Sequence, residues 1–147
     1  MRFELVVLLT ALVLAWSMWR GGAPERAFAG TLIVLVIADP IYHAIFGPPI
    51  FDRVDAGHGV IDTVGLAIFF LIGLKANRIW PLMACSLQII ACLGHIVRYM
   101  ELSGALGAYW AMTQVTFIGH LIILTCGTYL HIRRQRRGCM LMDWRGY

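Results

Sequence analysis

The stretch ADPIYHAIFGPPIFDRVDAGHGVID, residues 38–62, joins two long apolar runs through a short segment that contains glycine, proline and charge. On its first side an aspartate precedes a histidine by four residues, and on its second side a histidine precedes an aspartate by four. A spacing of four places two side chains on one face of a helix. The stretch therefore predicts a hairpin of two helices that carries two polar pairs.

The composition on both sides of this hairpin is typical of a membrane protein. Of the 147 residues, 60% are apolar and only 14% are charged, and the mean hydropathy is +0.76. The apolar residues form long runs without the polar face of a soluble helix. Because backbone groups in lipid must be hydrogen-bonded within their own segment, such runs become transmembrane helices, and none shows the alternation of a barrel strand.

Five apolar runs are long enough to cross a bilayer, for which about 17 to 25 residues are needed. Links that contain glycine, proline or charge separate them. The sequence therefore predicts an all-α integral membrane bundle of five transmembrane helices in a single domain, residues 1–147, with no soluble domain. The predicted helices are about 4–19, 27–46, 58–74, 79–100 and 107–131, followed by a basic cytoplasmic tail at 132–147.

Lysine and arginine predict the orientation of the bundle, since cytoplasmic segments carry an excess of both. With the N-terminus outside and the C-terminus inside, nine basic residues fall inside and three outside. The outer ones are Arg2, Arg53 and Arg98, and the inner ones are Arg20, Arg26, Lys75, Arg78, Arg133, Arg134, Arg136, Arg137 and Arg145. The first apolar run could also be a signal peptide, but the charged link RGGAPER (20–26) after it favours a retained helix.

Five ionisable side chains are predicted to form one polar layer near the outer face. They are Asp39 and His43 in the second predicted helix, His58 and Asp62 in the third, and His95 in the fourth. Neutral imidazole with carboxylate suits zinc, copper or iron, so a metal site is one interpretation. The others are a b-type haem with His43 and His95 as axial ligands, a proton relay, and plain hydrogen bonding that holds the helices together.

A buried polar seam is predicted to continue from this layer toward the middle of the membrane. Polar residues recur every three or four positions in the last two predicted helices, which places them on one face of each helix. The seam consists of Gln88, Tyr99, Thr113, Thr116 and His120. Hydrogen bonding between helices is the simplest interpretation of Gln88, Thr113, Thr116 and His120.

The basic tail is predicted to contact lipid. Four arginines, Arg133, Arg134, Arg136 and Arg137, follow the last apolar run and predict an anchor to anionic headgroups. A nucleic-acid interface is not indicated, because the excess of positive charge inside already explains these residues. The four cysteines contain no CxxC pair, so neither a redox pair nor a zinc knuckle is predicted.

Several stretches resemble a known group of proteins. They are RGGAPER (20–26), DAGHGVID (55–62), WPLMACSLQIIACLGHIVRYM (80–100) and AYWAMTQ (108–114). They look like a group of small, functionally unassigned five-helix integral membrane proteins of alphaproteobacteria, the sphingomonads in particular. The resemblance covers most of the chain and implies a bacterial inner-membrane protein, but it implies no activity.

A second resemblance concerns the chemistry of the outer layer. Asp39, then His43 after three intervening residues, then His58 is similar to the Asp/His/His copper site in the C subunit of membrane methane and ammonia monooxygenases. The spacing to the second histidine differs, and this chain is far shorter. The resemblance therefore concerns the ligand types and not kinship.

Two functions of different classes follow from these patterns. The first is a non-catalytic accessory subunit of a larger respiratory or photosynthetic membrane complex, which fits the short links between the helices. The second is a membrane metal- or haem-binding protein that uses the outer Asp/His layer in redox or proton chemistry. The expected partners are the lipid bilayer and other membrane subunits, and no nucleic acid.

Overall fold

The computed structural model describes residues 2–47, 56–100, 105–138 and 142–146. Arg53, one of the three basic residues predicted outside, and Cys139 lie outside the described residues, as does the side chain of Arg2. Within these ranges the chain forms five helices. They are α1 (Arg2–Arg20), α2 (Ala23–Phe46), α3 (Ala56–Lys75), α4 (Trp80–Tyr99) and α5 (Ala105–Arg136). The prediction of an all-helical fold is confirmed.

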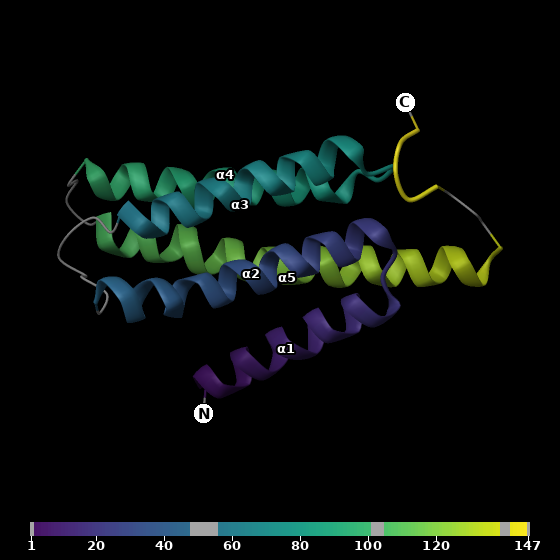
Figure 1. The fold of residues 1–147 in the computed structure, drawn as a ribbon, viewed down its shortest axis with the longest axis horizontal. Helices are drawn as coiled ribbons and strands as arrows, with labels where there is room; N and C mark the ends of the chain where they lie inside the picture. The colour runs from purple at the N-terminus through teal and green to yellow at the C-terminus, as the bar shows by residue number, and fades with distance from the viewer. Residues whose placement is uncertain (1, 48–55, 101–104, 139–141, 147) are drawn as a thin grey trace.

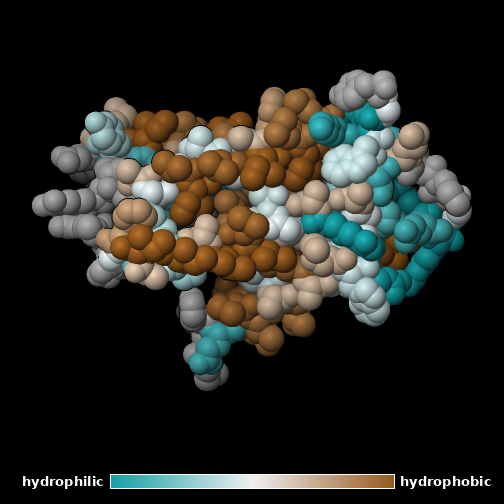
Figure 2. All heavy atoms as spheres, viewed as in Figure 1, coloured by the Kyte–Doolittle hydropathy of each residue, from teal (hydrophilic) through white to brown (hydrophobic). Residues whose placement is uncertain are grey.

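The surface of the bundle is apolar along most of its length. On the face drawn in Figure 2, apolar residues form a broad band across the middle and polar residues gather at one end. Val60 and Val115 are each 63% exposed, a degree of apolar exposure that soluble proteins avoid over large areas. Four helices are long and apolar enough to cross a membrane, namely α2, α3, α4 and residues 107–136 of α5. The protein therefore has the build of a membrane protein.

The helices lie side by side, with α1 along one flank (Figure 1). The longest helix, α5, packs against α4, α2 and α1. The links at 21–22 and 76–79 lie at one end of the bundle, which we call the arginine end. The end of α2 and the start of α3 lie at the opposite end, which we call the histidine end (Figure 1).

An aromatic core lies between these two ends. The rings of Phe28 and Phe69 stack with their centroids 4.2 Å apart, and Trp80 meets Phe28 edge-on at 5.3 Å. Phe28, Phe69 and Leu124 are fully buried. Phe28 follows the first turn of α2 and precedes Asp39, so the core separates the polar groups of the two ends.

The helix boundaries differ most from the predicted ones at α5. The sequence predicts a helix that ends near 131 and a tail from 132, whereas α5 continues to Arg136. Basic side chains can reach from a helix to the headgroups, so their charge does not end the helix, and cations are favourable in its last turn. Residues 142–146 are not a free tail either, because the amide of Arg145 donates to the carbonyl of Lys75 at 2.8 Å.

Candidate functional site

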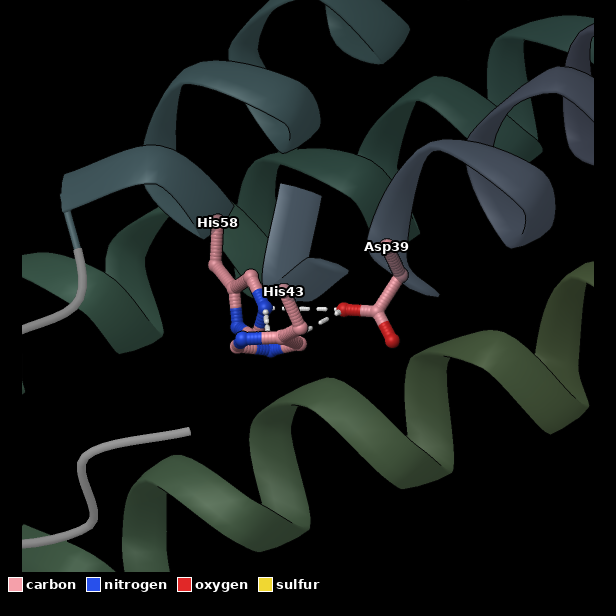
Figure 3. A group of neighbouring side chains, drawn as sticks. All are labelled: Asp39, His43 and His58. Carbon is pink, nitrogen blue, oxygen red and sulfur yellow. Dashed lines mark hydrogen bonds and ion pairs between the residues drawn. The ribbon is translucent and has the colours of Figure 1, made fainter. Parts of the chain in front are cut away.

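Three side chains of the predicted layer converge at the histidine end. Figure 3 shows the carboxylate of Asp39 pointing at the rings of His43 and His58. The Nε2 atom of His58 lies 2.8 Å from Asp39 Oδ1 and 2.9 Å from His43 Nε2, and the third side of the triangle, His43 Nε2 to Asp39 Oδ1, is 3.8 Å. One ligand atom from each residue therefore faces a common point.

The three ligand atoms lie close enough together for one metal ion to reach all of them. Three atoms with these separations lie on a circle with a radius of about 1.9 Å, whereas zinc binds imidazole nitrogen and carboxylate oxygen at about 2.0–2.2 Å. An ion at those distances would lie just off the plane of the three atoms. The donor set, two imidazoles and one carboxylate, suits zinc or copper.

The backbone at the end of α2 holds His43 in the tautomer that a metal ligand needs. His43 Nδ1 lies 3.0 Å from the carbonyl of Gly47, which can only accept, so Nδ1 carries the proton. A neutral His43 then presents the lone pair of Nε2 to the centre, and the proton between the two histidines belongs to His58. Gly47 has φ +105°, a conformation that glycine adopts at little cost. The turn after α2 therefore sets the tautomer of a candidate ligand.

A tyrosine packs against both histidines. The ring of Tyr42 lies 5.3 Å from the ring of His43 and 5.7 Å from the ring of His58. A Cβ on Gly57 would come within 2.2 Å of the Tyr42 ring, so glycine at this position permits the close approach of α2 and α3. This packing fixes the distance between the helices that carry the three candidate ligands.

The other two residues of the predicted layer form a separate cluster between α3 and α4. Asp62 accepts a hydrogen bond from His95 Nε2 at 2.8 Å and another from Gln88 Nε2 at 3.0 Å. Gln88 also donates to the backbone carbonyl of Asp62 at 3.1 Å. The carboxylate of Asp62 is thus satisfied by α4, and this cluster has the properties of structural pairing between helices.

The predicted seam is only partly buried. Gln88, Thr116 and His120 are 4%, 4% and 2% exposed, whereas Tyr99 is 75% exposed and does not belong to a buried seam. Thr113 and Thr116 donate to carbonyls of their own helix, so these hydroxyls do not join two helices. His120 Nε2 donates to the carbonyl of Ala84 at 3.1 Å among aromatic side chains, which makes it a satisfied core histidine.

The arginine end holds a buried charge network that the sequence analysis missed. Glu25 is fully buried, and its Oε1 lies 3.2 Å from Arg78 Nε and accepts a hydrogen bond from Trp80 Nε1 at 3.2 Å. Arg78, itself 6% exposed, also donates through Nη2 to Asp143 and to His131 Nδ1. Among the described residues, Glu25 Oε2 and Arg78 Nε and Nη1 are buried without a hydrogen-bond partner, so the charges of the two side chains depend on their mutual pairing and on the bonds of Arg78 Nη2.

Asp143 ties this network to the start of α2. Its second carboxylate oxygen accepts a hydrogen bond from the amide of Ala23 at 2.9 Å, so a residue near the C-terminus caps the first turn of α2. The amide of Asn77 donates to the Asp143 carbonyl at 3.1 Å, which fixes the segment against the link after α3. A Cβ on Gly22 would come within 2.6 Å of His131, so the close packing here depends on glycine.

The four arginines of the predicted lipid anchor lie at this same end. Arg133, Arg136 and Arg137 are exposed, and Arg134 is partly buried and donates to the carbonyl of Leu130 at 3.2 Å. Three of them belong to the last turn of α5 and not to a flexible tail. Their guanidinium groups therefore project from a rigid element.

The chain was compared with protein-family models, with curated proteins and with solved structures, and none of the three comparisons gives a match. The function is therefore inferred from the geometry of the side-chain clusters described above. The resemblance to the alphaproteobacterial group stays a prediction.

Proposed function

We propose that the protein is a membrane protein that binds one transition-metal ion, copper or zinc, through Asp39, His43 and His58. The observation that carries this proposal is the convergence of Asp39 Oδ1 and the two Nε2 atoms on one point. Metal binding would require the proton to leave His58 Nε2, either to Nδ1 of the same ring or to solvent, because a ring nitrogen binds a metal through its free lone pair. The hydrogen bond from His43 Nδ1 to the carbonyl of Gly47 supports the same assignment, because a ligating histidine usually donates its other ring proton.

The site would leave one coordination position free. Three protein ligands fill three positions of a tetrahedral ion, and the fourth then takes water or another small molecule. The side chains of His43 and His58 are 16% and 24% exposed and that of Asp39 is 55% exposed, so the open side is the side of Asp39. A haem between His43 and His95 is not favoured, because the Nε2 atoms of the two histidines bond to His58 and Asp62.

Elemental analysis of the purified protein tests the metal proposal. We expect about one copper or zinc ion per chain after purification or after loading and gel filtration, and a copper-loaded sample should show the absorption and paramagnetic resonance of Cu(II) bound by nitrogen and oxygen. A chain that retains no stoichiometric metal after loading, in either form, contradicts the proposal.

We further propose that all five helices, α1 included, cross the inner membrane of a bacterium with the histidine end outside and the arginine end in the cytoplasm. The nine-to-three distribution of basic residues supports this orientation. In a chain without native cysteines, a cysteine at Gln135 should react with an impermeant reagent only after the membrane is opened. A cysteine at Tyr99, which is 75% exposed, should react in intact cells. The reverse pattern refutes this orientation.

An accessory role in a larger complex is the second candidate function, and the surface around Asp39 favours it. Val36 lies three residues before Asp39 on the same face of α2 and is 42% exposed, so the half-exposed carboxylate of Asp39 would otherwise face lipid at high cost. A partner subunit over this face would shield it. After mild solubilisation of its own membranes, a tagged chain should then co-purify with other subunits in fixed ratio, and recovery of the chain alone speaks against a stable complex.

A further inference from the structure

A cavity opens between α1 and α5 at the arginine end. Its volume is about 300 Å³, and it is open to the outside on one side. Six residues line it, two from α1 and four from the last turns of α5. They are Trp16, Arg20, Tyr129, Ile132, Arg133 and Arg136.

The lining has a strong positive charge that it does not neutralise itself. Three of the six residues are arginines and none is acidic. The guanidinium of Arg20 also lies 5.4 Å from the centre of the Trp19 ring, a contact that attracts a cation and orients it. Arg20 and the two arginines of α5 come from different helices, so they surround the cavity instead of forming a single row. The site therefore has the charge of an anion site, and its guanidinium groups match phosphate oxygens.

The rest of the lining and its surroundings are apolar. Trp16 and Tyr129 are of the types that concentrate at the headgroup level of membranes. Leu12, which is 58% exposed, lies one turn from Trp16 on the same face of α1, and Ile122, which is 59% exposed, lies two turns from Tyr129 on α5. An apolar track therefore runs from the cavity along the two helices toward the middle of the bundle.

We propose that this cavity binds one anionic phospholipid, with its phosphate between Arg20, Arg133 and Arg136 and an acyl chain along the groove between α1 and α5. Basic pockets between helices on the cytoplasmic side are places where anionic headgroups bind. The combination of three arginines with an adjoining apolar track favours a phospholipid over free phosphate, because free phosphate has no acyl chain that could lie in the track. The site lies at the opposite end of the bundle from Asp39, His43 and His58 and is independent of metal binding.

Lipid titration of the full-length protein in detergent, followed by native mass spectrometry, tests the proposal. We expect phosphatidylglycerol and diphosphatidylglycerol to bind at least tenfold more tightly than phosphatidylcholine. Each of the substitutions Arg20→Gln, Arg133→Gln and Arg136→Gln should weaken binding of the anionic lipids about fivefold, the usual contribution of one basic residue at such a surface. Glycerol phosphate at millimolar concentration should not displace the bound lipid.

Arg137→Gln is the matched control, because Arg137 is exposed, directly follows Arg136 and does not line the cavity. It removes the same charge and should change lipid binding less than twofold. An equal loss in Arg137→Gln and Arg136→Gln overturns the proposal in favour of diffuse attraction to the membrane surface. Equal binding of phosphatidylcholine, or displacement by glycerol phosphate, overturns it as well.

Discussion

Replacement of Arg78 by methionine should lower the free energy of unfolding by about 3 to 5 kcal/mol, the usual loss when one partner of a buried ion pair is removed. Methionine occupies a similar space but leaves Glu25, which is fully buried, with Trp80 as its remaining described partner. It also removes the cation that binds Asp143 beside the first turn of α2. Thermal or denaturant unfolding in detergent, monitored by tryptophan fluorescence, measures the loss.

Two further variants separate this effect from a general loss of charge. Arg137→Met removes an exposed arginine at the same end and should change the stability by less than about 0.5 kcal/mol. The double variant Glu25→Gln/Arg78→Met removes both buried charges and should recover at least half of the loss, because replacement of a whole buried pair is often nearly neutral. If Arg78→Met is as stable as Arg137→Met, the network contributes nothing to the fold.

The helices were predictable from the sequence because lipid leaves few alternatives to a helix for a long apolar run. The links were also visible, as in the glycine pair Gly21 and Gly22 between α1 and α2. The end of α5 was not predicted, because hydropathy falls at Arg133 while the helix continues on the hydrogen bonds of its own backbone. Hydropathy marks where lipid contact ends and not where the helix ends.

The sequence predicted the residues of the candidate metal site as part of a larger layer, but not which of them contact one another. The spacing of four correctly places Asp39 and His43 on one face of α2, but the short contact of Asp39 is with His58 on α3. His95 bonds to Asp62 and not to the other two histidines. Which pairs form depends on the rotation of each helix about its axis, and this rotation is set by packing contacts such as Tyr42 against Gly57.

The network at the arginine end could not be found from spacing at all. Glu25, Arg78 and Asp143 are far apart in the sequence. Glu25 and Arg78 lie in or next to links and Asp143 lies in the predicted tail, where charge is expected in each case. The charge rule that predicts the orientation of the bundle uses every basic residue in a link, whether it is exposed or buried, so it does not reveal which of them are buried. The one local signal was the position of Glu25 directly after Pro24, since proline and then an acid are typical of the first turn of a helix.

Replacement of His58 by alanine should abolish metal binding while the bundle still inserts and folds. His58 Nε2 is the ligand atom that lies within 3 Å of both others, so its loss leaves two donors 3.8 Å apart and too few to hold the ion. The metal content after loading should fall from about one ion per chain to less than about a tenth of that, and the affinity by at least about 100-fold, since even a supporting residue contributes 10- to 100-fold.

His95→Ala decides between a three-residue site and the predicted five-residue layer. Because His95 bonds to Asp62, its loss should reduce stability but leave the metal content unchanged, whereas a shared layer would lose its ion. His120→Ala is the control for loss of a buried histidine elsewhere in the core.

The substitution Gly47→Ala changes no ligand and tests whether the turn after α2 holds His43 in the tautomer that binds metal. Alanine at φ +105° is strained, so the carbonyl that fixes the tautomer of His43 should move, and metal affinity should fall about 10- to 100-fold. Gly30→Ala, which lies within α2 and has nothing within 4 Å of the added carbon, is the matched control and should bind metal like the original chain. If both glycine variants bind metal equally well while His58→Ala does not, the three ligands are correct but His43 does not depend on the carbonyl of Gly47.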